Sequence, residues 1–339
     1  MERILFMNRK KLIFDVDTGS DDALALMSVL LNDDIFEVIG VCTVSGNRDV
    51  ENTTENTLRV MQLLHREDIP VIKGASRPLI AKLDYTRHIN QELEVVDENG
   101  EIISYHAQYL PLPEATIEPL KGIHAASWYI KTLLESKEKI TLVLTGPLTN
   151  FALAYRTAPE ILEHIEEIVI MGGGKNQTNS TSASEFNIFF DPEAAFITLS
   201  VGSSVPLTLM MLDATHQAYL TYEDADRLRK MNNAVGEFAA VETESRIKAY
   251  NMLQPLDKKD IAPIHDALCV MYLMDHSVIT KKEFLHVDVI CGGIANGQTL
   301  IDNRRASTSI KNVNVCYSTD TDKFREMLVS SLERSKNII

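Results

Sequence analysis

Four carboxylates stand within eight residues near the start of the chain, where residues 11–22 read KLIFDVDTGSDD. They are Asp15, Asp17, Asp21 and Asp22. Four negative charges at this spacing repel one another strongly unless a cation lies among them. Oxygen ligands suit a hard cation such as Ca²⁺ or Mg²⁺, so the cluster predicts a metal site. The alternative is that Asp21 or Asp22 only caps a helix N-terminus, a common role for one or two aspartates.

Four further segments carry polar groups that could act on a substrate. They are VSGN at 44–47, LTGPLTN at 144–150, MGGGKNQTNSTSASEFN at 171–187 and PIHDALCV at 263–270. Each has an ordinary structural explanation when taken alone, such as a turn residue, a helix cap or a structural histidine. Together they add amides and carboxylates, which hold hydroxyl groups in fixed directions, and a histidine suited to proton donation. The combination indicates a sugar or polyol held beside a cation.

The elements that must position these groups alternate along the chain. Apolar, β-branched runs predict strands at 12–16, 36–43, 140–144, 168–171 and 205–211. Helical patterns cover 23–31, 52–64, 125–134, 194–199 and 264–273. This alternation predicts an α/β fold, with a mainly parallel, Rossmann-like central sheet flanked by helices. Ligands bind beyond the carboxyl ends of such strands, so we expect the polar segments to share one site.

Residues 80–119 differ from the rest of the chain. They are polar, charged and proline-containing, and they predict a long irregular excursion of the kind that often forms a lid. No repeat or linker divides the chain, so we expect one domain over residues 1–339. Gly19 is expected to supply the backbone conformation of the aspartate turn.

Composition excludes several classes of function. The net charge of −15 argues against partners such as nucleic acid or an anionic membrane, which need basic patches. Four scattered cysteines predict reduced, buried thiols in a cytoplasmic protein. We expect neither a signal peptide nor a membrane-spanning run.

The motifs together identify a resemblance. DVDTGSDDALAL, VSGN, LTGPLTN, MGGGKNQTNSTSASEFNIFFDPEAA, LDATHQ and PIHDALCV resemble, in order and spacing, the nucleoside hydrolase family of the inosine–uridine-preferring kind. The resemblance implies hydrolysis of the N-ribosidic bond of ribonucleosides in nucleoside salvage, by a homodimer or homotetramer. It does not separate purine from pyrimidine substrates. The glycines of the family's base-closing loop are absent here, and His106 in ISYHAQYLPLP is the nearest counterpart.

The resemblance also implies roles for individual residues. A Ca²⁺ ion would be bound by Asp17, Asp22, Asp266 and the main-chain carbonyl of Thr145, with Asp17 also the base and Asp15 a supporting partner. Ribose would be held by Asp21, Asn47, Met171, Asn179, Glu185 and Asn187. His265 would protonate the departing base, and Tyr250 and His106 are possible contacts of that base.

Three other readings remain for comparison. A haloacid-dehalogenase-type phosphatase also begins with a strand and DxD, but Thr18–Gly19 reverses its usual order, and it does not require Asp21 and Asp22. An EF-hand needs Asp or Asn where Gly19 stands. A nucleoside- or ribose-binding protein that lost its chemistry is the alternative of a different class, although Asp17 and His265 are both present.

Overall fold

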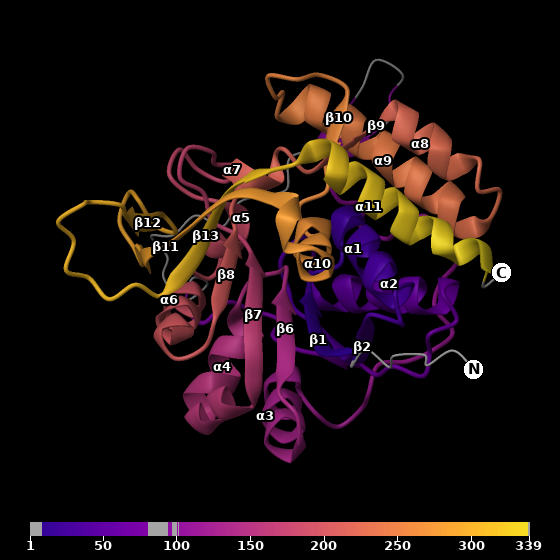
Figure 1. Cartoon of the computed structure of the whole chain (residues 1–339). Coiled ribbons are helices and arrows are strands. Elements are labelled where there is room, and N and C mark those ends of the chain that lie inside the picture. Colours follow the sequence, from indigo (N-terminus) through magenta and orange to yellow (C-terminus); the bar gives the residue numbers. More distant parts are fainter. Residues whose placement is uncertain (1–8, 81–93, 97–99, 101, 338–339) are drawn as a thin grey trace, which may run out of the picture.

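A nine-stranded sheet forms the centre of the computed structural model, in the order β12-β11-β13-β8-β7-β6-β1-β2-β3 (Figure 1). The structure describes residues 9–80, 94–96, 100 and 102–337. From β13 to β3 neighbouring strands pair in parallel, whereas β11 pairs antiparallel with both β13 and β12. The predicted mainly parallel α/β sheet is therefore confirmed, with an antiparallel edge that the sequence did not reveal.

The strands of this sheet are β1 (Lys10–Val16), β2 (Phe36–Thr43), β3 (Val71–Lys73), β6 (Ile140–Leu144), β7 (Ile165–Met171), β8 (Leu207–Met210), β11 (Ile279–Val289), β12 (Thr299–Asp302) and β13 (Val313–Thr319). Two small antiparallel pairs lie outside it: β4 (Glu94–Val96) with β5 (Ile102–Ser104), and β9 (Tyr219–Thr221) with β10 (Ile261–Pro263).

The helices are α1 (Ser20–Leu30), α2 (Val50–Leu63), α3 (Ala125–Glu135), α4 (Thr149–Thr157), α5 (Phe186–Phe190), α6 (Pro192–Ser200), α7 (Leu212–Thr215), α8 (Tyr222–Arg229), α9 (Ala234–Leu253), α10 (Ala267–Met274) and α11 (Thr321–Glu333). Within the described residues, no helix is long and apolar enough to cross a bilayer.

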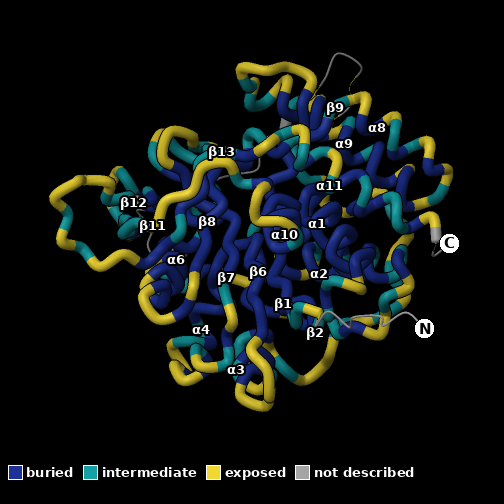
Figure 2. Tube along the Cα trace, viewed as in Figure 1, coloured by how far each residue is buried: buried dark blue, intermediate teal, exposed yellow. Residues whose placement is uncertain are grey.

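Alternation along the strands divides the core between the two faces of the sheet. Leu12, Phe14 and Val16 of β1 pack with α1, α2, α10 and α11, whereas Ile13 packs with α3, α4 and α6. Successive strand side chains point to opposite faces, and here both faces are covered. The sheet and inner helix surfaces are accordingly buried (Figure 2). This double covering fixes the strand ends that carry the polar segments.

Some expectations differ from the structure. The excursion at 80–119 contains the β4–β5 pair, and part of it (81–93, 97–99 and 101), like the N-terminal residues 1–8, lies outside the described residues. Cys291 is exposed, whereas Cys42, Cys269 and Cys316 are buried, and none of these four described cysteines forms a disulfide. The PIHD segment follows β10 of a small sheet rather than a strand of the central one. Local patterns cannot reveal which sheet a three-residue strand joins.

Candidate active site

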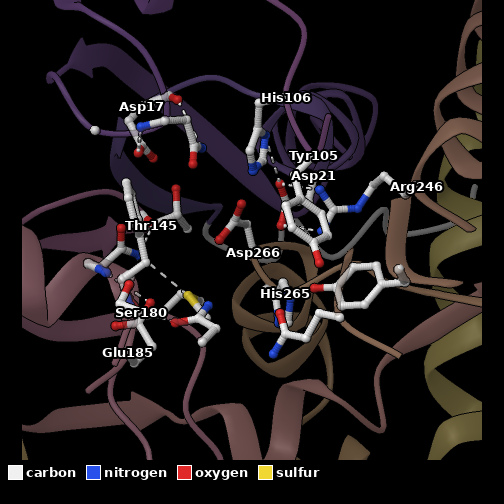
Figure 3. A pocket seen from close by; sticks show the side chains of 18 residues that line it. Asp17, Asp21, Tyr105, His106, Thr145, Ser180, Glu185, Arg246, His265 and Asp266 are labelled. Carbon is white, nitrogen blue, oxygen red and sulfur yellow. Dashed lines mark hydrogen bonds and ion pairs between the residues drawn. The ribbon is translucent and has the colours of Figure 1, made fainter. Parts of the chain in front are cut away.

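A cavity of about 290 Å³ opens at the carboxyl ends of the parallel strands, where the aspartate turn, the segments after β6 and β7, and helix α9 meet (Figure 3). Such a volume is at the small end of the range for small-molecule sites. The predicted site residues that line it are Asp17, Asp21, Asn47, His106, Thr145, Met171, Asn179, Glu185, Asn187, Tyr250, His265 and Asp266. Asp15 and Asp22 lie behind this lining.

Hydrogen bonds from the backbone and from neighbouring side chains hold the aspartate turn together. The backbone N–H of Asn47 donates to Oδ2 of Asp17 at 2.7 Å, and its Nδ2 donates to Oδ2 of Asp22 at 3.2 Å. Asp22 also accepts from the N–H of Gly19 and from Oγ1 of Thr145, both at 3.0 Å. Gly19 has an ordinary φ of −106°, but a Cβ there would lie 2.0 Å from Nδ1 of His106. The glycine is therefore needed for the approach of His106, not for an unusual backbone conformation.

The buried carboxylates have the donor chemistry of a cation site. One oxygen each from Asp21, Asp22 and Asp266 lie within 4.8 Å of one another. Burial and then repulsion from Asp21 raise the pKa of Asp22 to about 7, and burial with three neighbouring aspartates raises the pKa of Asp266 well above its ordinary value. Burial and the charge of Asp22 raise the pKa of Asp17 in the same way. A divalent cation reverses such shifts by favouring the ionised carboxylates, so these residues fit a hard metal ion.

Asp21 differs from the neighbouring aspartates because an arginine side chain is paired with it. Arg246 of α9 donates from Nη1 and Nη2 to the two oxygens of Asp21, at 3.0 and 3.1 Å. Burial opposes ionisation of Asp21, but the Arg246 guanidinium, helped by two histidines, holds its pKa below the ordinary value. Of the three carboxylates in the cluster, Asp21 is thus the least available to a metal ion.

Thr145 and the segment after β7 form the opposite wall of the cavity. Nδ2 of Asn187 donates to the carbonyl of Thr145 at 2.6 Å, and Glu185 caps α5 by accepting from the N–H groups of Asn187 and Ile188. Burial raises the pKa of Glu185 to about 7. Met171 ends β7 below them, while Asn179 lies at the exposed rim and accepts from the N–H of Phe186.

Asp15 supports the turn from behind. It is buried in β1, and Nδ2 of Asn150 donates to both of its carboxylate oxygens at 3.1 Å. The N–H of Thr145 donates to its carbonyl at 2.9 Å. These bonds tie β1 to β6 and α4, and they place the Thr145 carbonyl next to the aspartate turn.

His265 and Tyr250 form a hydrogen-bonded pair on the α9 side. The imidazole Nε2 lies 2.5 Å from the Tyr250 hydroxyl, and Nδ1 lies 2.7 Å from Oγ1 of Thr215. Burial holds the pKa of His265 well below its ordinary value and raises the pKa of the Tyr250 hydroxyl well above its own. Both groups are therefore neutral near pH 7, and a proton can pass along their shared bond.

The segment after β5 closes the cavity above the aspartate turn. Its His106 lies 3.9 Å from Asp21, and burial lowers its pKa to about 4. The ring of Tyr105 meets the ring of Tyr250 edge-on, with centroids 5.2 Å apart, and its buried hydroxyl has no hydrogen-bond partner among the described residues. Tyr105 thus lines the cavity with a hydroxyl that no other described residue binds.

Sequence reasoning missed several residues of the lining: Gly46, Tyr105, Ser180, Phe186, Arg246 and Gln254. Arg246 had a visible signal, since it stands four residues before Tyr250 and both occupy one face of a helix. Tyr105 stands directly before His106. Neither position in the sequence shows that Arg246 pairs with Asp21 or that Tyr105 contacts Tyr250.

Comparisons with known proteins agree with this geometry. The family model described as inosine-uridine preferring nucleoside hydrolase matches residues 12–326. The pyrimidine-specific ribonucleoside hydrolases RihA of Shewanella woodyi and of Photobacterium profundum are each 33% identical, over 96% and 95% of this chain and 98% of their own.

Solved structures give the same result. A purine-preferring ribonucleoside hydrolase from Gardnerella vaginalis superposes with a TM-score of 0.83 at 28% identity, covering 97% of this chain and 100% of its own. The plant nucleoside hydrolase PpNRh1 superposes with a TM-score of 0.80 at 27% identity, covering 95% and 98%. The similarity extends over the elements that build the cavity.

Proposed function

This chain belongs to the inosine-uridine preferring nucleoside hydrolase family, and we propose that it hydrolyses the N-ribosidic bond of pyrimidine ribonucleosides with the help of Ca²⁺. As a member of that family it is a hydrolase acting on N-glycosyl compounds. The observation that carries the proposal is the cavity that lies between the acidic cluster and the Tyr250–His265 pair. The pyrimidine preference in this proposal is taken from the RihA relatives.

Asp17, Asp22, Asp266 and the Thr145 carbonyl would hold the cation. When bound, the cation supplies positive charge that neutralises the carboxylates and makes the attacking water more acidic. The Asn187 amide already fixes the Thr145 carbonyl, and Asn47 fixes Asp17 and Asp22. We prefer Asp17 to Asp21 as a ligand because both oxygens of Asp21 bind Arg246.

Asp17 would remove the proton of the attacking water. One of its oxygens accepts from Asn47, which leaves the other for the water. Cleavage of the N-ribosidic bond builds positive charge on the sugar, as glycoside hydrolysis does. The surrounding carboxylates, including Glu185, stabilise that charge, and the amides at 47, 179 and 187, with Asp21 and Met171, surround the ribose.

The departing base would receive its proton from Tyr250. With His265 protonated at Nε2, the imidazole donates to the tyrosine oxygen, and the phenolic hydrogen is then free to point into the cavity. Thr215 can donate to Nδ1 and so favours that tautomer. His265 therefore acts behind Tyr250, and His106 and Tyr105 are the nearest further contacts of the base.

Tyr250→Phe and His265→Ala are each expected to lower kcat on uridine by about 100-fold, because both interrupt one proton transfer. The double variant should lose little more than either single variant, since the groups act in series. Steady-state kinetics test this, with 4-nitrophenyl riboside as a matched substrate whose leaving group needs no proton and whose kcat should hardly change. Losses that multiply in the double variant would contradict a relay.

The proposal is tested by product analysis on a panel of uridine, cytidine, inosine and adenosine. We expect free ribose from uridine and cytidine at a higher kcat/KM than from the purine nucleosides. Adding phosphate should change neither rate nor product. Ribose 1-phosphate would indicate a phosphorylase, and tight nucleoside binding without turnover would favour the alternative of a binding protein.

The enzyme should discriminate strongly against 2′-deoxyuridine. A missing hydroxyl leaves the polar groups that surround the ribose unpaired, which lowers kcat/KM by at least about 100-fold. Parallel kinetics on uridine and 2′-deoxyuridine measure the ratio. A ratio below about five would show that the 2′-hydroxyl is not part of the recognition.

We further propose that the protein acts in nucleoside salvage in the cytoplasm as a homodimer or homotetramer. The cysteines at 42, 269, 291 and 316 form no disulfide among the described residues, which fits a reducing compartment. Light scattering of the purified protein at several concentrations would determine its mass in solution, and a monomer throughout would contradict the assembly.

A further inference from the structure

All five N–H donors of Arg246 are used by the protein itself. Nη1 donates to Oγ of Ser20 at 2.8 Å and to Oδ1 of Asp21, and Nη2 donates to Oδ2 of Asp21. Nε and Nη2 donate to the carbonyl of Pro263 at 3.1 and 2.9 Å. An arginine has five such donors, so none is left for a substrate. Arg246 can therefore influence the reaction only through the groups that it holds.

Those groups belong to both ends of the cavity. Ser20 and Asp21 begin α1 at the aspartate turn, and Pro263 stands two residues before His265. Arg246 itself lies on α9, one turn before Tyr250. It is 2% exposed, and no other lysine or arginine lines the cavity in the part of the chain that the structure describes.

Asp21 needs such a partner because it lies close enough to compete for the cation. Its carboxylate belongs to the group of three whose oxygens lie within 4.8 Å of one another. Without a fixed counter-charge, rotation of the Asp21 side chain would bring a further negative ligand to the metal. The planar fork of an arginine holds a carboxylate by two parallel hydrogen bonds and so fixes its plane as well as its charge.

We propose that Arg246 is a positioning residue that keeps Asp21 out of the cation's coordination shell and reserves it for the ribose hydroxyls. Each oxygen of Asp21 keeps a lone pair beyond the one that accepts from Arg246, so the carboxylate can still receive a hydroxyl hydrogen. The inference rests on the proposed function, in which Asp21 contacts ribose. It adds a residue that no motif of the sequence identified.

The test compares Arg246→Lys and Arg246→Met with the unmodified chain. Lysine retains the charge but cannot form the fork, so kcat/KM on uridine should fall by about tenfold, mainly through KM. Methionine removes both the charge and the fork, and the fall in kcat/KM should approach 100-fold. Ca²⁺ affinity, measured by calorimetry without substrate, should be unchanged in the lysine variant and unchanged or higher in the methionine variant.

A background variant shows whether the effect passes through Asp21. In Asp21→Asn protein, the further change Arg246→Lys should cost less than twofold in kcat/KM. Arg229→Lys is the matched control, because Arg229 also forks onto a carboxylate, that of Glu244 on α9, but at the surface. It should leave kcat/KM within twofold.

Each outcome decides the inference. A kcat/KM on uridine for the Arg246→Lys enzyme within threefold of that of the unmodified chain would overturn the inference. A parallel loss of Ca²⁺ affinity, melting temperature and activity would also overturn it, since that pattern denotes a purely structural arginine. If Arg246→Met does not fold, Arg246→Lys alone carries the test. Failure of the proposed function is distinct, because the unmodified chain would then release no ribose.

Discussion

Replacing Asp17 with asparagine is expected to lower kcat on uridine by at least about 1,000-fold. The change removes the carboxylate proposed to take the proton of the attacking water, a step that general-base catalysis accelerates by roughly 100- to 10,000-fold. It also removes one negative ligand of the proposed cation site. The asparagine side chain has the same size and can still accept from the Asn47 N–H that now binds Asp17.

Two measurements separate the roles of Asp17. Calcium affinity should fall, but saturating Ca²⁺ should not restore turnover, because the proton acceptor is missing. Recovery of more than a tenth of kcat at saturating Ca²⁺ would show that Asp17 is only a ligand. Asp191→Asn is the matched control, since Asp191 is buried at the start of α6 and its described partners, Leu79, Thr149 and Ala194, do not line the cavity. The Asp191→Asn variant should have a different melting temperature, and its kcat should stay within about threefold of that of the unmodified chain.

The neighbours His265 and Asp266 are expected to separate catalysis from metal binding. The His265 ring faces Thr215 and Tyr250, whereas the Asp266 carboxylate faces Asp21 and Asp22. Asp266→Asn should weaken Ca²⁺ binding on the order of 100-fold, because calcium affinity depends on the number of charged ligands. His265→Ala should leave that affinity within about threefold.

Calorimetric titration of both variants with Ca²⁺ measures this contrast, with circular dichroism to confirm the fold. The His265→Ala protein should bind calcium and yet turn over uridine about 100-fold more slowly. Loss of calcium binding in that variant would mean that the two side chains are not independent. Unchanged binding in Asp266→Asn would exclude Asp266 from the cation site.

The sequence predicted the aspartate turn well because the apolar runs that define its strand and helix lie directly beside it in the chain. Leu12 to Phe14 are fully buried, and the run from Ala23 onward is buried on all sides, so strand and helix follow from the apolar pattern alone. The placement of Thr145 after β6 and of Asn47 after β2 follows from the rule that parallel strands end at one edge.

The α9 side of the cavity could not be predicted in the same way. Helix α9 buries Glu242, Thr243 and Arg246 among its apolar residues, which breaks the pattern that marks an ordinary amphipathic helix. The pairing of Arg246 with Asp21 joins residues 225 positions apart. Burial of an arginine is costly without such a partner, but a single sequence does not show which carboxylate provides it.

The antiparallel edge of the sheet was missed for a related reason. Strand β11 reads as a mostly exposed segment, with lysines and a glutamate along its first half. Only Val287 and Val289 in its second half are buried in the core, and pairing with β13 and β12 holds the rest of the strand in the sheet. Strand order between distant segments is a property of the whole chain, which local periodicity does not contain.

The most direct test of the central claim is turnover of uridine by protein that has been stripped with a chelator and then titrated with Ca²⁺ in phosphate-free buffer. We predict that stripped protein releases no ribose and that Ca²⁺ restores release in parallel with its binding. The Asp266→Asn protein should need far more Ca²⁺ for the same recovery. Full ribose release from stripped protein would contradict a cation-dependent hydrolase.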